Sequence, residues 1–181
     1  MKNLLIFISL FLLFSSYSCS KQDDCDNPVD CLPPATQTGA NTAGCLVNGE
    51  ILLPGGRSLG SGSVLHSQYL FHQGAYIFSL GINDRKKNQL VSISTKNVEL
   101  EEGILYTLTT ASSNSSSGIY VRGLSGSENG FVTNETSIGE LKISRIDRSN
   151  RIVSGTFWFN AMNGKGEIVK VREGRFDVVY Q

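Results

Sequence analysis

Residues 151–161 read R-I-V-S-G-T-F-W-F-N-A, and apolar and polar side chains alternate along this stretch. Successive side chains of a β-strand point to opposite faces of its sheet, so the alternation predicts a strand with one buried face. The residues predicted to face the core are Val153, Gly155, Phe157, Phe159 and Ala161. The residues predicted to face away from it are Ser154, Thr156, Trp158 and Asn160.

Three similar runs surround this strand and predict an antiparallel meander of four strands. The runs are 139–146, 167–171 and 175–180. Turn-forming residues separate them, with Glu173-Gly174 predicted as the last turn. Val169, Val171, Phe176, Val178 and Tyr180 join the predicted core face. Lys170, Arg172, Arg175 and Asp177 join the polar face, where the charged side chains are expected to form exposed cross-strand pairs.

The chain before this meander also consists of short strands and turn signals. A hairpin around Asn48-Gly49 is predicted within residues 45–53. Further predicted strands cover 64–72, 75–82, 90–95, 104–110 and 118–122. No segment repeats apolar residues with the period of a helix over several turns. The sequence therefore predicts one all-β domain over residues 45–181, built as an antiparallel β-sandwich or flattened barrel.

The N-terminus predicts export. Lys2 precedes the apolar run Leu4–Phe14, and small residues follow it. This order is typical of a signal peptide. As a helix the run would span roughly 16 Å, whereas a bilayer core is about 30 Å thick. Residues 1–18 are therefore interpreted as a removable signal peptide, not as a membrane span.

Cys19 follows the signal peptide directly and indicates a site of lipid attachment. Residues 16–19, S-Y-S-C, resemble the cleavage box of bacterial lipoproteins, in which the final Cys is acylated and anchors the chain. The alternative is an ordinary export signal with a spare Cys. Residues 21–24, K-Q-D-D, resemble the acidic export tag of surface lipoproteins, or form a plain polar spacer. Residues 19–44 are interpreted as the lipidated Cys and a flexible tether, rich in Pro near its end.

Charge and cysteine content exclude some classes of protein. Without residues 1–18 the chain keeps 163 residues, with 15 basic and 16 acidic side chains, so a nucleic-acid partner is not expected. An exported protein can form disulfides. Cys25, Cys31 and Cys45 allow one bond and leave one thiol over, and the pairing stays open. Their spacing does not fit a zinc site, and no metal or cofactor is expected.

Two blocks of the mature chain resemble a known family. L-P-P-A-T-Q-T-G-A-N-T-A-G-C-L-V-N-G (32–49) and the block from V-S-G-T-F-W-F-N-A to G-R-F-D-V (153–178) look like a family of Bacteroidota outer-membrane lipoproteins of unknown function. The resemblance implies an envelope lipoprotein held at the outer membrane, on the cell surface or facing the periplasm. It implies no catalytic residue.

Trp158 is the strongest candidate for a binding residue. It is the single Trp of the chain, and it is expected on the polar face beside Thr156, Asn160 and Arg172. An aromatic ring among hydrogen-bonding groups can stack on a sugar. The alternative is that a loop, 55–63 or 112–118, covers the ring and makes it a second small core.

Signals for an enzyme are weak. Residues 56–60, G-R-S-L-G, match the nucleophile pattern of hydrolases at Ser58, but the helix that such a site needs is not predicted after it. His66 and His72 fall on one strand, too far apart to share a ligand. Three readings remain, in order: a lipid-anchored, non-enzymatic binding or structural domain, a carbohydrate-binding module using Trp158, and a hydrolase using Ser58.

Overall fold

Eleven strands form one mixed sheet in the computed structural model, which describes residues 25–56, 62–112, 114–123 and 129–181. The strands are β1 (Thr42–Val47), β2 (Glu50–Leu52), β3 (Leu65–His72), β4 (Ala75–Asp84), β5 (Gln89–Lys96), β6 (Leu105–Leu108), β7 (Ser115–Arg122), β8 (Gly130–Val132), β9 (Gly139–Asp147), β10 (Ile152–Met162) and β11 (Ile168–Val179). A short 3-10 helix, η1 (Pro28–Cys31), precedes them. The predicted all-β fold is confirmed.

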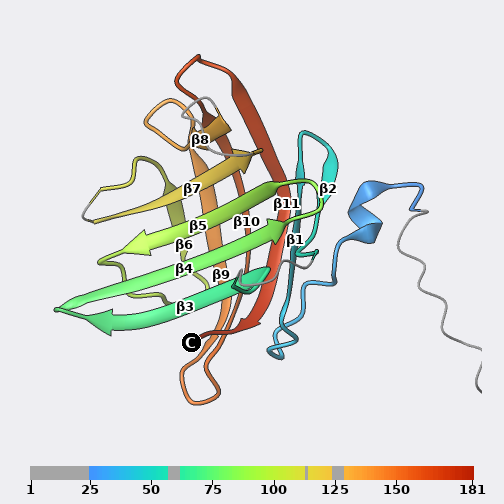
Figure 1. The fold of residues 1–181 in the computed structure, drawn as a ribbon. Coiled ribbons are helices and arrows are strands. Elements are labelled where there is room, and N and C mark those ends of the chain that lie inside the picture. The colour runs from blue at the N-terminus through green and yellow to red at the C-terminus, as the bar shows by residue number, and fades with distance from the viewer. Residues whose placement is uncertain (1–24, 57–61, 113, 124–128) are drawn as a thin grey trace, which may run out of the picture.

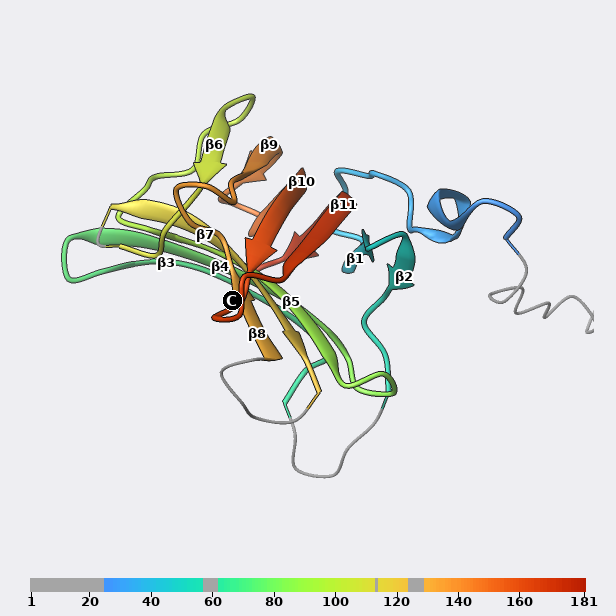
Figure 2. The same cartoon turned by 90° about the horizontal axis from the view of Figure 1, so that it is seen from above.

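The sheet folds over itself into two layers. Its order is β2-β1-β11-β10-β9-β6-β7-β5-β4-β3, and every pairing is antiparallel except the β6–β7 pair. Figure 1 shows β3, β4, β5 and β7 crossing the strands from β9 to β11 at a steep angle, and Figure 2 shows the two groups from above. β8 pairs with both β7 and β10. Gln181 exchanges backbone hydrogen bonds with Ser67 and Tyr69, so the chain end lies against β3.

The core lies between these layers. The predicted core face of β10 and β11 is confirmed, since Phe157, Phe159 and Phe176 are all buried. The ring of Phe78, from β4, lies 6.0 Å from that of Phe176 between ring centroids. Burial of large apolar side chains across both layers supplies the main driving force for this fold.

The C-terminal meander has three strands, not the predicted four. Residues 168–179 form one continuous strand, and Glu173-Gly174 does not turn the chain. The register with β10 instead shifts between Phe157 and Phe159, and Glu173 has φ of 53°. A β-bulge inserts one extra residue into a strand. The bulge changes the phase of side-chain alternation, which is why the sequence resembled two strands.

Other element boundaries also differ from the prediction. The hairpin at Asn48-Gly49 is confirmed between β1 and β2, with positive φ at both residues. Residues 115–117, predicted as part of a loop, extend β7 and pair with β5. The short strand β8 was not predicted. In the described part of the chain no helix is long and apolar enough to cross a membrane.

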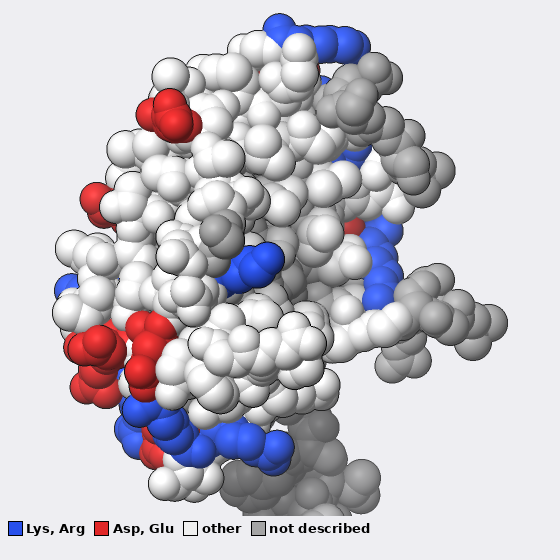
Figure 3. Space-filling view, turned by 90° about the vertical axis from the view of Figure 1, so that its left-hand side faces the viewer, with Lys and Arg blue, Asp and Glu red and all other residues white. Residues whose placement is uncertain are grey.

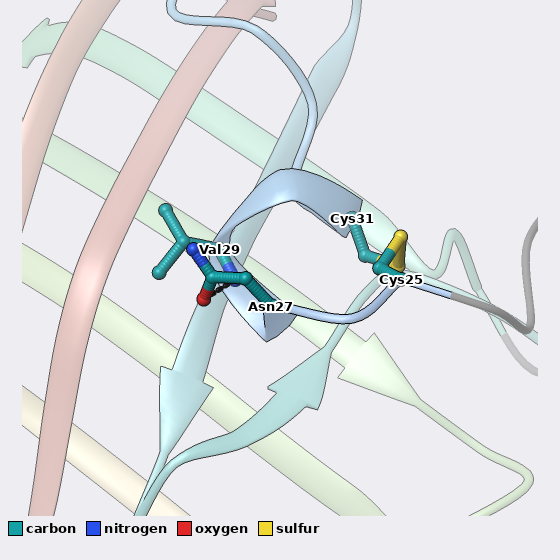
Figure 4. The surroundings of a disulfide bond; sticks show 4 residues. All are labelled: Cys25, Asn27, Val29 and Cys31. Carbon is teal, nitrogen blue, oxygen red and sulfur yellow. Dashed lines mark hydrogen bonds between the residues drawn. A yellow bond between two sulfur atoms is a disulfide. The ribbon is translucent and has the colours of Figure 1, made fainter.

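The segment before β1 packs on the sheet. Cys25 and Cys31 form a disulfide that closes the loop around η1, and Asn27 accepts a hydrogen bond from the Val29 backbone within it (Figure 4). Leu32 is buried. The segment 36–40 then donates hydrogen bonds to the carboxylate of Asp177, from the Thr36 hydroxyl at one end to the Ala40 N–H at the other. The prediction of a flexible tether as far as residue 44 is therefore wrong for the described residues from 25 on.

Candidate functional site

The predicted polar face of β10 is present, and Trp158 lies on it. Trp158 is half-buried between exposed Thr156 and half-buried Asn160 along the strand. Glu140, on the neighbouring strand β9, pairs with Trp158. Arg172, on the other neighbouring strand β11, lies next to the Trp158 ring. The four residues predicted for binding are thus brought together on one surface.

Fixed contacts hold the indole of Trp158 in place. The guanidinium carbon of Arg172 lies 5.2 Å from the ring centroid, which is a cation–π contact. The indole N–H donates to a carboxylate oxygen of Glu140 at 3.0 Å. Arg172 itself donates to the side-chain oxygen of Asn160 at 2.7 Å and to the backbone oxygens of Phe159 and Val171. The ring is therefore oriented from two sides by charged groups.

The bulge in β11 explains how Arg172 reaches this position. Phe157 pairs with Gly174 and Phe159 pairs with Val171, so Arg172 and Glu173 together lie opposite Trp158. A bulge commonly re-aims a side chain next to a functional site. Because of the extra residue, Arg172 and Arg175 both lie on the polar face although they are three positions apart.

A groove runs along this surface. It has a volume of about 470 Å³ and takes in the ring of Trp158. Its remaining lining comes from the N-terminal segment and from four strands: Ala35, Leu105, Glu140, Lys142, Thr156, Phe157, Arg172, Glu173, Gly174 and Arg175. Loops 55–63 and 112–118, which the alternative hypothesis placed over Trp158, contribute no described residue to this lining. The groove therefore joins one aromatic surface to several charged and hydroxyl groups, the combination suited to a polar ligand with an apolar face.

Asp177 was expected in an exposed charge pair, and that expectation is wrong. Its side chain is fully buried and accepts hydrogen bonds from the Thr36 hydroxyl at 2.6 Å, the Ser154 hydroxyl at 2.7 Å and the Gly39 N–H at 2.8 Å. Burial raises the pKa of Asp177, but the hydrogen bonds to its ionised form outweigh burial, and the net pKa lies well below the ordinary value. Asp177 is therefore a structural clasp for the N-terminal segment.

Charges elsewhere on the described surface are mixed. Arg148 pairs with Glu99, and Arg145 pairs with Asp147. In the face drawn in Figure 3, acidic and basic groups lie side by side and not in a field of one sign. An exposed pair such as Arg148–Glu99 contributes little to stability.

The other candidate residues do not assemble into a site. Cys19 and Ser58 lie outside the described residues. His66 and His72 lie on one strand, β3, six positions apart as predicted, and both are exposed. Cys45 is the free cysteine among the described residues, and burial raises the pKa of its thiol to about 12. No cluster of three metal-binding side chains occurs among the residues that the structure describes.

Among the comparisons with known proteins, only the one with protein families finds a match. Residues 74–179 match the protein family described as "Domain of unknown function (DUF6252)". This match covers more than half of the chain and spans β4 to β11, which includes the bulge, Trp158 and most of the groove. Searches of curated proteins and of solved structures find no match.

Proposed function

The chain belongs to the DUF6252 family, a domain of unknown function, and from this starting point we propose that it is a non-enzymatic carbohydrate-binding domain of an envelope lipoprotein. Trp158 and its groove form the binding site, and Cys19 carries the lipid anchor. The domain is held at the outer membrane, with the cell surface favoured over the periplasm. The proposal refines the broader prediction of a lipid-anchored binding or structural domain.

One observation carries the proposal: the indole of Trp158 borders a groove and is fixed by Arg172 and Glu140. Sugar rings present apolar C–H faces and hydroxyl edges, so a rigid aromatic ring among hydrogen-bonding groups complements them. An aromatic ring that is already oriented loses little conformational entropy when a ligand binds. Thr156, Lys142 and Arg175 supply polar groups within the same groove.

The arrangement is less suited to catalysis. Among the described groove residues, no Ser, His and carboxylate lie together as a nucleophile, base and orienting group would. The groove carboxylate of Glu140 is also occupied, since it accepts a hydrogen bond from the Trp158 indole. A binding role therefore fits these residues better than a hydrolytic one.

A panel of polysaccharides tests the proposal. The full-length chain in detergent is applied to immobilised neutral and acidic polysaccharides, and Trp158→Ala is compared with wild type. We expect wild type to bind at least one member and Trp158→Ala to lose that binding, because stacking on the indole disappears. Phe71→Ala is the control, since Phe71 is 63% exposed on β3 and does not line the groove.

Two outcomes would contradict the proposal. Binding that survives Trp158→Ala would place the sugar elsewhere. A wild-type chain that binds no member of the panel would favour the structural alternative, in which the domain packs against another envelope component. Thermal unfolding of both variants accompanies the assay, because loss of binding through unfolding would not count as support.

A further inference from the structure

A row of polar residues crosses the groove next to Trp158. Thr156 on β10 pairs with Lys142 on β9 and with Arg175 on β11. Directly paired residues have Cβ atoms about 5 Å apart, so both long basic side chains can reach over the small Thr156. Leu105 pairs with Lys142 and closes the outer end of the row.

The two cations of this row lack strong partners. Lys142 is exposed and forms no ion pair among the described residues. Arg175 donates a long hydrogen bond of 3.4 Å from Nε to the backbone oxygen of Glu173, and its guanidinium lies 3.8 Å from the Glu173 carboxylate, too far for a second one. By contrast, the third groove cation, Arg172, is fully engaged by Asn160 and backbone oxygens. Lys142 and Arg175 lie on either side of Thr156, two strands apart, so an anion seated over Thr156 would interact favourably with both cations.

The groove also carries an excess of positive charge. Its described lining has three basic residues, Lys142, Arg172 and Arg175, against two acidic ones, Glu140 and Glu173. The remainder of the chain is close to neutral, so this excess is local. Glu140 is turned toward the indole N–H, which leaves the Lys142–Thr156–Arg175 row as the positive part of the groove.

From this arrangement we infer that the bound sugar is acidic, with its carboxylate or sulfate seated over Thr156 between Lys142 and Arg175. The inference rests on the proposed carbohydrate-binding function and specifies the ligand class. The sugar ring stacks on Trp158, and the Thr156 hydroxyl donates to the anionic group. Charge-assisted hydrogen bonds of this type are the stronger ones, so the row decides selectivity between acidic and neutral sugars.

The test uses the full-length chain in detergent with four probes. These are oligogalacturonate, its neutral methyl ester, the sulfated polysaccharide heparin and vesicles containing an anionic phospholipid, supplemented by the neutral and acidic members of the panel above. We expect binding to acidic members and weak or no binding to neutral ones. Lys142→Met should weaken acidic-sugar binding by about tenfold, with a similar loss in Arg175→Met. Lys86→Met, in the exposed β4–β5 turn, is the matched control for loss of one positive charge.

The outcomes separate this inference from the proposed function. Binding to neutral sugars that needs Trp158 but is unchanged by Lys142→Met overturns the acidic-sugar inference and leaves the proposed function standing. Binding to no sugar overturns both. Binding to the anionic vesicles without binding to any acidic sugar also overturns the inference, because the row would then recognise a lipid headgroup. Weakening by Lys86→Met as strong as by Lys142→Met would show that only net charge matters, and would overturn it as well.

Discussion

At the scale of single residues, two side chains on the polar face of the meander have opposite roles. Trp158 borders the groove, whereas Asp177 is withdrawn from solvent and fastens residues 36–40. An ionised carboxylate is costly to bury unless hydrogen bonds compensate. Asp177 receives them from hydroxyl and backbone N–H donors, and no cation pairs with it among the described residues.

Replacing Asp177 with Asn should therefore destabilise the fold. An amide cannot accept on both of its terminal atoms, so several of these donors would lose their partner. We expect the free energy of unfolding at pH 7 to fall by about 2–3 kcal/mol, measured by urea denaturation. Asp26→Asn, at an exposed position, is the control and should change it by less than about 0.5 kcal/mol.

Strong acid should reduce this difference in stability. Because the folded-state pKa of Asp177 lies below its unfolded value of about 3.9, the ionised carboxylate stabilises the fold above that pH and loses this effect as the pH falls further. The gap between wild type and Asp177→Asn should thus be unchanged from pH 7 to about pH 4 and shrink as the pH falls below that value. A gap that stays constant would mean that the carboxylate's charge is not what holds the segment.

At the scale of elements, close approach between β9 and β10 positions the site. Gly139 begins β9 opposite Phe159, and a Cβ there would overlap the backbone oxygen of Trp158 and the Cβ of Phe159. On the other side of β10, a Cβ at Gly174 would come within 2.5 Å of the Phe157 ring. These glycines let the strands carry large aromatic residues in register, and Gly174 sits directly after the bulge that sets Arg172 opposite Trp158.

Gly139→Ala should consequently weaken both the fold and the site. The overlapping atoms belong largely to the strand backbone and cannot rotate away, so we expect a loss of about 2–3 kcal/mol in the free energy of unfolding. Gly164→Ala is the control, since a Cβ there meets nothing within 4 Å. Equal stability of the two variants in thermal or urea unfolding would contradict this account of the β9–β10 contact.

At the scale of the whole molecule, the packed N-terminal segment shortens the expected tether. The sequence suggested a free chain from Cys19 to residue 44, which could extend roughly 90 Å. The disulfide, buried Leu32 and the hydrogen bonds to Asp177 hold residues 25–41 on the domain. Only the chain from Cys19 to Cys25 is then left as a tether, and it could extend about 20 Å. If Cys19 is lipidated, this short chain holds the domain close to the membrane.

The anchor and its location are testable in cells. Cys19→Ala should move the chain from the membrane fraction to the soluble fraction, because acyl chains supply the membrane affinity. Ser20→Ala is the neighbouring control and should stay with the membrane. Protease added to intact wild-type cells should degrade the domain if it is displayed outside. A membrane-bound Cys19→Ala chain would contradict lipid anchoring, and a domain protected until the outer membrane is broken would place it in the periplasm.

The sequence by itself determined the all-β class, the core face of β10 and β11 and the grouping of Trp158, Thr156, Asn160 and Arg172. Alternation within each strand sets the face of its side chains, and the short turn at 163–166 brings the strand with Arg172 beside the strand with Trp158. Only the tertiary structure decided that Glu173-Gly174 is a bulge, that Asp177 is buried and that Lys142 and Arg175 flank Thr156. Each of these depends on which strand lies beside which, and contacts between residues distant in sequence leave no periodic signal along the chain. Asp177 and Thr36 are separated by 141 positions, so the clasp exists only once the sheet has formed.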